Sequence, residues 1–396
     1  MTKEWLDRSR QLPLHLSLVY PAGDSNEPAP GPLIPLFNVV QNVSPRWHKL
    51  VLGISPILYT TFLGEVYYVP SLKTLKLLNI EDWEEQGEFC LDTPLLKHLD
   101  IQVSILIFSV SINWSSLTTL EATHVTMGEY FSILRICGGL ECFRLRGLVG
   151  DIQYPLPTTP FTHSALRELY LETNWAAQVV IDPSELASIL NLVAFPSLKK
   201  FGYKPGMENL FPTRAIPSIF NRSRCQLTHF DLSGCIVNGT SDDLIFILSD
   251  LPTITHFKLE DTYRHSDNRI MTDKLLRKLI PIHHSEFTHT DRLLPRLESL
   301  EFLGYKGFSW GCLASVVSAT AYGDPNLLVT SARPVCTNSI PRISFRICLE
   351  EEMEHIDAQS LARFKDAHRA GIFHYQALRG FFAGGFIDPF LGDDLS

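Results

Sequence analysis

The chain has 396 residues, of which 45% are hydrophobic and 19% are charged, and its formal net charge is −9 with a pI near 5.9. This apolar fraction is ample for a continuous core, and the length suits two or three ordinary domains or one long solenoid. The acidic balance disfavours a general nucleic-acid binder, which is normally basic with a face of Lys and Arg.

Targeting signals and cysteine spacing indicate the compartment. The first eleven residues lack the apolar core of a secretory signal. The longest apolar run, at 101–112, is interrupted by polar residues and is shorter than the ~20 residues that span a bilayer. The eight cysteines form no C-x-x-C pair. We therefore expect a cytoplasmic or nuclear protein with reduced cysteines and no membrane contact.

Residues 1–44 are predicted to form a lead-in. A possible helical turn around Trp5 is followed by an alternating stretch whose apolar side chains stand at positions 12, 14, 16 and 18, a strand pattern. Residues 21–35 contain five prolines without periodicity, which predicts a flexible connector.

The best-defined motif of the chain lies at 227–237. It fits the leucine-rich repeat pattern L-x-x-L-x-L-x-x-N/C-x-L, with Phe230 and Leu232 on the core side of a short strand. The alternating residues His229, Asp231 and Ser233 should face outward, and Cys235 should lie in the turn after the strand.

The motif recurs along the chain. The first apolar position of each unit, called the anchor, is followed by apolar residues at +3 and +5, and most steps between anchors are close to the ~20–29 residues of this repeat class. The anchors are Trp47, Leu72, Leu96, Leu117, Leu140, Leu166, Leu198, Leu227, Ile254 and Leu297. Six anchors have a proline two residues earlier: Pro45, Pro70, Pro94, Pro196, Pro252 and Pro295. The +8 turn position is polar in several units: Ser104, Asn174, Cys235 and Thr262. We therefore predict about ten irregular repeats over 45–350.

Helical returns between the strands have recognisable start signals. Residues 182–192 begin with Asp182, then a proline and an acidic residue, and Thr240 and Thr272 precede two further helical patterns. Residues 310–322 predict another helix, and 343–347 an eleventh strand. The segment 351–379 is predicted to hold a C-terminal helix at 357–370 and a capping strand at 372–378, followed by a poorly packed tail at 380–396.

These elements predict an α/β fold: a leucine-rich-repeat solenoid, or horseshoe, with a parallel concave sheet and helical or irregular convex returns. The outward side chains stand at +2, +4 and +6 from each anchor. The +4 column alternates in charge, which suits a protein or peptide partner, whereas a phosphate backbone would need one continuous sign. An ordinary solvated sheet face is the alternative. The candidate partner-binding residues are Lys76, Asp100, Glu121, Arg144, Tyr170, His229, Asp231, His256, Lys258 and Glu301.

Several segments resemble a large class of fungal F-box proteins with leucine-rich repeats. They are WLDRS at 5–9, LPLHLSL at 12–18, SPRWHKLVL at 44–52, DKLLRKL at 273–279 and LPRLESLEF at 294–302. The resemblance implies the substrate-recognition part of a ubiquitin-ligase receptor. In that family a helical F-box module precedes the segment resembling 5–18 and binds the Skp adaptor. Adaptor binding is therefore expected only if an F-box lies upstream of Met1, and an adaptor-free interaction protein is the alternative.

No catalytic motif stands out. The sequence contains no G-x-x-x-x-G-K-[ST], G-x-G-x-x-G, G-x-S-x-G or H-E-x-x-H pattern. The most ligand-like cluster, His283, His284 and His289 near Glu286 and Asp291, falls in a predicted polar loop and is interpreted as solvated. We expect no cofactor, no metal and no catalytic residue. An enzyme would require a pocket with clustered titratable groups.

Overall fold

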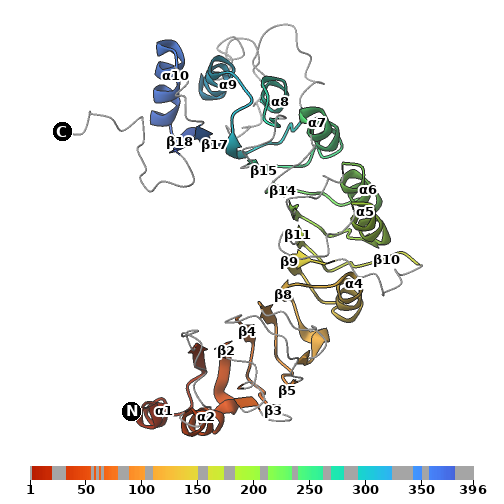
Figure 1. The fold of residues 1–396 in the computed structure, drawn as a ribbon, viewed down its shortest axis with the longest axis vertical. Helices are drawn as coiled ribbons and strands as arrows, with labels where there is room; N and C mark the ends of the chain where they lie inside the picture. The colour runs from red at the N-terminus through yellow and green to blue at the C-terminus, as the bar shows by residue number, and fades with distance from the viewer. Residues whose placement is uncertain are drawn as a thin grey trace, which may run out of the picture. The chain divides into compact units, whose positions relative to one another are not determined.

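The computed structural model describes residues 2–19, 33–54, 58, 62–63, 67–78, 89–102, 110–149, 159–173, 183–205, 213–233, 240–261, 269–280, 293–322, 342–349 and 356–379. The chain divides into two compact units (Figure 1). The first comprises 1–181 with 192–197, and the second comprises 182–191 with 198–396.

The first unit contains strands, three α-helices and two short 3-10 turns among its described residues. Its helices are α1 (Thr2–Arg8), α2 (Ile34–Gln41) and α4 (Met127–Ile136), with the turns η1 (Ser44–Arg46) and η3 (Trp114–Ser116). Its longer strands are β1 (Leu14–Val19), β2 (Trp47–Gly53), β4 (Thr74–Leu77), β6 (His98–Ile101), β8 (Thr119–Thr123), β9 (Cys142–Leu148) and β11 (Glu168–Thr173). Its short strands are β3 (Tyr67–Tyr68), β5 (Phe89–Asp92), β7 (Val110–Ser111), β10 (Phe161–Thr162) and β12 (Val193–Ala194).

Among the described residues of the second unit, each strand but the last is followed by a helix. Its helices are α5 (Pro183–Leu192), α6 (Ala215–Ser223), α7 (Ser241–Ser249), α8 (Asp273–Leu279), α9 (Trp310–Tyr322) and α10 (Ala358–Arg369). Its strands are β13 (Lys200–Lys204), β14 (His229–Leu232), β15 (His256–Asp261), β16 (Ser299–Tyr305), β17 (Arg342–Leu349) and β18 (Phe373–Arg379).

The long strands pair in parallel and in chain order. The order is β1-β2-β4-β6-β8-β9-β11 in the first unit and β13-β14-β15-β16-β17-β18 in the second. The first unit also has a short parallel sheet, β3-β5-β7, and the pair β10-β12. Parallel neighbours that follow one another along the chain require a return segment after every strand. The fold is thus mixed α/β, with an extensive parallel sheet and interleaved helices, and is compatible with a solenoid-like arrangement.

A tight turn directly before the strand recurs at several anchors. The amide N–H of Leu72 donates to the carbonyl oxygen of Val69, and Leu96, Leu117 and Ile254 each repeat this bond to the residue three earlier. The anchors are fully buried, from Trp47 at 0% exposure to Leu297 at 2%. Proline favours turns, and it has no backbone N–H to donate to the hydrogen bonds of a sheet. It therefore suits the position two residues before the anchor, ahead of the strand.

The core lies between the sheet and the helices. In the second unit the rings of Phe201, Phe230 and Phe257 stack along neighbouring strands with centroid distances of 6.1 and 5.9 Å. Phe220 from α6 packs edge-on against Phe201 at 5.2 Å. In the first unit Tyr130 from α4 stacks on Phe143 of β9 at 5.8 Å, and α4 lies beside β8 and β9 in Figure 1. The apolar +3 and +5 side chains therefore face the helices.

The predicted helices and strands of the second unit are confirmed at α5, α7, α8, α9, α10, β17 and β18. Thr240 caps α7 by accepting a hydrogen bond from the amide of Asp243, and Asp357 caps α10 in the same way through Ser360. Gly371, with φ of 70°, follows the end of α10. These are local signals, and they act independently of the rest of the fold.

Three of the helices that the structure describes were not predicted. The segment 21–35 was expected to be a connector, but its end belongs to α2, which has a proline in its first turn. Helix α4 begins with a capping box formed by Thr126 and Glu129, a signal that the sequence carries. Helix α6 has no side-chain cap hydrogen bond. Leu12, expected on the apolar side of the lead-in strand, is instead 66% exposed because β1 begins only at Leu14.

Some predicted features lie outside the described residues. They are most of the 21–35 connector, the +8 turn residues Ser104, Asn174, Cys235 and Thr262, the histidine loop at 283–291 and the tail at 380–396. Among the helices that the structure does describe, none combines the length and the apolar character needed to cross a membrane.

Candidate partner-binding face

In each unit one face of the sheet is lined by polar side chains. Burial alternates along the strands, as in β15, where Phe257 and Leu259 are buried while His256, Lys258 and Glu260 are half-buried. We call the sheet face that carries the +2, +4 and +6 side chains the polar face. Neighbouring strands pair at equivalent positions, so these side chains form rows across the strands.

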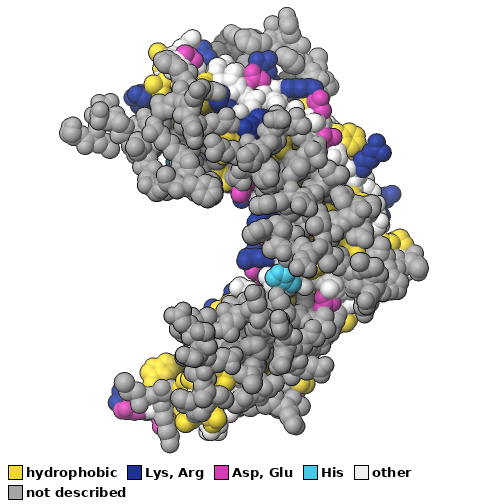
Figure 2. Space-filling view, in the orientation of Figure 1, with side chains coloured by type: hydrophobic (Ala, Val, Ile, Leu, Met, Phe, Trp, Pro, Cys, Tyr) yellow, Lys and Arg dark blue, Asp and Glu magenta, His cyan; other side chains and the backbone are white. Residues whose placement is uncertain are grey.

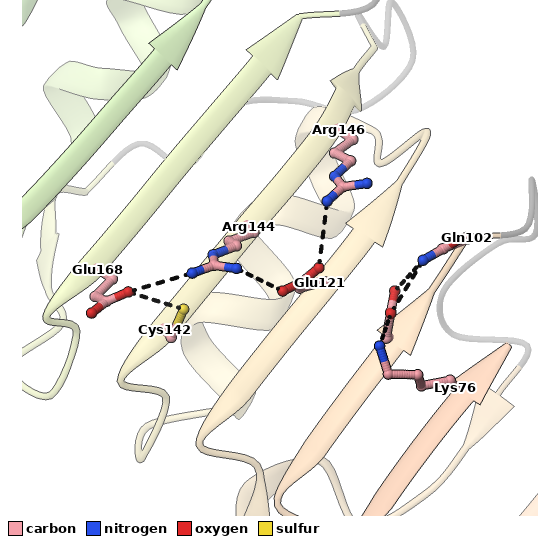
Figure 3. A network of polar contacts seen from close by, with 8 residues as sticks. Lys76, Gln102, Glu121, Cys142, Arg144, Arg146 and Glu168 are labelled. Atoms are coloured by element: carbon pink, nitrogen blue, oxygen red, sulfur yellow. Dashed lines mark hydrogen bonds and ion pairs between the residues drawn. The ribbon is translucent and has the colours of Figure 1, made fainter. Parts of the chain in front are cut away.

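In the first unit the +4 residues form ion pairs with one another (Figure 3). Lys76 Nζ lies 2.8 Å from Asp100 Oδ2, and Arg144 Nη1 lies 2.9 Å from Glu121 Oε1. Asp100 is only 7% exposed and also accepts hydrogen bonds from Gln102 Nε2 at 3.2 and 3.3 Å. The alternating charge of the column is thus neutralised within the sheet.

The +2 and +6 columns extend this network. Glu168 Oε2 lies 3.7 Å from Arg144 Nη2 and accepts a weak hydrogen bond from Cys142 Sγ at 3.7 Å, while Arg146 Nη2 lies 3.7 Å from Glu121 Oε2. Burial raises the pKa of the Cys142 thiol, Arg144 opposes this effect, and the carboxylate of Glu168 adds to it. A neutral thiol that donates to a carboxylate is a poor nucleophile.

The second unit carries a weaker network on its polar face. Lys258 Nζ lies 3.7 Å from both Asp231 Oδ2 and Glu260 Oε2, and Ser233 Oγ donates to Asp231 Oδ1 at 2.7 Å. Figure 2 shows side chains of both signs lying next to each other on the visible surface. Ion pairs this exposed contribute only about 0–1 kcal/mol each. These ion pairs therefore determine the local charge pattern and contribute little to the stability of the fold.

Two histidines stack on this face. The rings of His229 and His256 are parallel within 4°, with centroids 4.2 Å apart. Each Nδ1 lies 2.9 Å from the hydroxyl of the preceding threonine, Thr228 or Thr255. Those hydroxyls donate their own hydrogen to the carbonyl oxygens of Lys199 and Thr228. Each threonine hydroxyl therefore lies between a histidine ring and a main-chain carbonyl oxygen, and links the ring to the backbone.

The ten predicted residues are thus distributed over the polar faces of both units. Lys76–Asp100, Glu121–Arg144, Asp231–Lys258 and His229–His256 are brought together in pairs. Tyr170 is half-buried and stands beside Arg144 in register, and exposed Glu301 stands beside Lys258 in register. These placements describe geometry, and whether the residues bind a partner stays a prediction.

The sequence-based candidates omitted the +2 and +6 participants Gln102, Cys142, Arg146, Glu168 and Glu260, although two other +2 residues, His229 and His256, were among them. The sequence does indicate that these residues face outward, because the side chains of a strand alternate between its two faces. The histidine stack also had a signal: the triplet Thr-His-Phe occurs at 228–230 and again at 255–257.

Within the described residues, no group of three or more His, Cys, Asp or Glu side chains is placed to hold a metal ion. Cys137 lies in the turn between α4 and β9, and burial raises the pKa of its thiol to about 12. The buried His163 donates from Nε2 to the Cys137 carbonyl oxygen at 3.0 Å, which caps the end of α4.

Comparison with models of protein families and with curated proteins found no match to the chain.

Proposed function

We propose that the chain is a non-catalytic leucine-rich-repeat scaffold that binds a protein partner on its polar face. The observation that carries the proposal is the alignment of polar side chains in rows across consecutive parallel strands, opposite a face buried against helices. A row of side chains on a rigid sheet is preorganised. These side chains therefore lose little conformational entropy when a partner binds.

The leucine-rich-repeat assignment rests on three supports. The anchors are buried, turns recur directly before the strands, and the apolar +3 and +5 residues pair in register, for example Leu75 with Leu99 and Leu77 with Ile101. A unit of this kind cannot bury its own apolar face, and stacking on its neighbours does so. A horseshoe curvature belongs to the same proposal.

The resemblance to F-box proteins narrows the proposal to a substrate-recognition role in a ubiquitin ligase, in the cytoplasm or nucleus. Adaptor binding would then require an F-box encoded upstream of Met1. Identification of such an exon, followed by capture of the Skp adaptor with the longer product, tests this step. If neither is found, the adaptor-free scaffold is the better proposal.

Nucleic acid is not favoured as a partner. The ion pairs of Lys76 and Arg144 leave no continuous positive surface in the first unit's described +4 column, and phosphate binding depends on such a surface.

Site-specific photocrosslinking tests the use of the polar face. A photoreactive phenylalanine analogue replaces Thr119 in the first unit or Ser299 in the second, both half-buried on the polar face, and replaces exposed Phe246 on α7 as the control. The same partner should crosslink at one or both polar-face positions and not at Phe246. Crosslinks confined to Phe246, or equal at all three positions, would refute the proposed face.

A further inference from the structure

Basic side chains gather where the strands of the first unit begin. The +1 residues of β2, β4 and β6 follow one another on a backbone ladder, in which the amides of Lys73 and Lys97 donate to the carbonyl oxygens of His48 and Lys73 at 3.0 Å. Beside them, His15 of β1 pairs in register with Lys49, and Thr74 links Lys49 to His98. We call the six basic residues at these positions the basic rim: His15, His48, Lys49, Lys73, Lys97 and His98.

The lysines of the basic rim have no acidic partner among the described residues. Lys49 and Lys73 take part there in no ion pair and no side-chain hydrogen bond. Lys97 Nζ donates to the carbonyl oxygen of Ser116 at 3.1 Å, which leaves two of its three donors and does not neutralise its charge. Lys76 differs, because Asp100 at 2.8 Å neutralises it. The rim is therefore a place on the first unit where positive charge is not compensated.

The basic rim is accessible, and its positive groups act on one another. Lys49 and His48 are half-buried, and the other four residues are exposed. The rings of His15 and His48 stack with their centroids 5.5 Å apart. Partial burial lowers the pKa of His48, and the charges of Lys73 and His15 lower it further. Like charges held this close to one another create a positive potential that favours an anionic group.

We propose that the basic rim binds an acidic segment of the protein partner, which lies extended across the strand starts. Lys49, Lys73 and Lys97 hold its carboxylates, and the three histidines border the contact without any need for protonation. The inference rests on the scaffold function proposed above and specifies the chemistry of the partner at one end of the first unit.

The dimensions of the rim fit a short peptide. Neighbouring strands lie about 4.8 Å apart, so the three intervals from β1 to β6 span about 14 Å. An extended chain advances about 3.4 Å per residue, and about five residues cover this width. Beyond β6 the next +1 residues are Thr118 and exposed Glu141, whose carboxylate would repel a longer anionic chain. A nucleic acid backbone would need positive charge over more strands, so an acidic peptide is the better fit.

A fluorescein-labelled peptide of six glutamates tests the inference on the full chain by fluorescence anisotropy. At neutral pH and low ionic strength we expect saturable binding that weakens as salt is added, because salt screens exposed charges. A peptide of six glutamines should not bind.

Charge reversal locates the contact. The double variant Lys49→Glu/Lys73→Glu should lose at least about tenfold in affinity for the glutamate peptide. The matched control Lys199→Glu/Lys365→Glu changes the net charge equally and should bind as the parent does. Lys199 is an exposed +1 residue of the second unit, and Lys365 is exposed on α10. Lys49→Gln/Lys73→Gln removes the charges without adding repulsion and should lose about threefold, which covers the case in which the reversed variant does not fold.

Crosslinking relates the peptide result to the partner. Thr119 pairs in register with His98, so Lys49→Glu/Lys73→Glu should also reduce capture of the partner by the photoreactive analogue at Thr119.

Three outcomes would overturn the inference: no binding of the glutamate peptide by the parent, equal losses in the two charge-reversed variants, or tighter binding of a single-stranded hexanucleotide. The second outcome would assign binding to net charge alone, and the third would assign the rim to phosphates. If the peptide fails while a partner still crosslinks at Thr119 or Ser299, the scaffold function stands and only the acidic chemistry is wrong. If neither occurs, both proposals fail.

Discussion

The buried carboxyl group of Asp261 should make the second unit less stable at neutral pH than at mildly acidic pH. Asp261 is the last residue of β15 and is 2% exposed. The backbone of Ile270 provides one hydrogen bond, whereas Oδ2 has no hydrogen-bond partner. Burial raises the pKa of this carboxyl from 3.8 to about 6, with Ile270 and the charge of Arg269 opposing the rise.

The magnitude follows from this rise in pKa. Between pH 3.8 and about 6 the folded state binds more protons than the unfolded state, so stability increases as the pH falls through this window. Above about pH 6 the buried charge costs about 3 kcal/mol relative to the neutral acid. Asp261→Asn keeps an acceptor oxygen for Ile270 and removes the charge. We expect the variant to be about 2–3 kcal/mol more stable than the parent at pH 8 and equal to it near pH 4.

Urea unfolding at several pH values measures this difference. Hydrogen exchange of the β15 and β16 amides reports it without the assumption that the two units unfold together. Glu298→Gln, at an exposed carboxylate just before β16, is the matched control and should change stability by less than about 0.5 kcal/mol. Equal stability of Asp261→Asn and the parent at pH 8, or a difference that does not shrink on acidification, would refute the reasoning.

Four further predictions concern packing, capping and thiol reactivity. Gly304→Ala should destabilise by about 1–3 kcal/mol in urea unfolding, because its Cβ would lie 2.1 Å from a backbone oxygen, while Gly311→Ala on α9 meets no atom within 4 Å and should be neutral or stabilising. Leu232→Asp should cost about 4 kcal/mol or more, because it buries a charge between β13 and β15, and a variant that melts like the parent would disprove the strand register. Thr240→Ala should cost about 1 kcal/mol in thermal unfolding and Thr240→Ser almost nothing, since the serine hydroxyl preserves the cap of α7. Cys137, whose thiol has a pKa of about 12, should stay unmodified by iodoacetamide in the native protein and react only after unfolding, as read by peptide mass spectrometry.

The strands were predictable because their signal is local and repeated. Each anchor is followed by apolar residues at +3 and +5, and the strand period of two then fixes which side chains face outward. Helices with caps, such as α7 after Thr240, were predictable for the same reason. Helix α4 was missed although its capping box was present, and α6 was missed because no side-chain hydrogen bond caps its start.

The composition of the polar face could be read in part from the sequence. The alternation of sign at Lys76, Asp100, Glu121 and Arg144 was visible, but it was interpreted as a surface ready for a partner. In the structure these charges satisfy one another across neighbouring strands. Sequence spacing gives the column, whereas the pairing depends on strand separation and side-chain reach, which only the folded sheet supplies.

The sequence by itself determined that strands recur at near-regular steps, which side chains of each strand are apolar, and where turns and several helices begin. These properties follow from residue periodicity and from caps that act over a few residues. The tertiary structure alone decided the order and register of the strands, the stacking of His229 on His256, and the burial of Asp100 and Asp261. Each of these depends on contacts between segments far apart in the chain, and their energies depend on distance and solvent exclusion that no local pattern encodes.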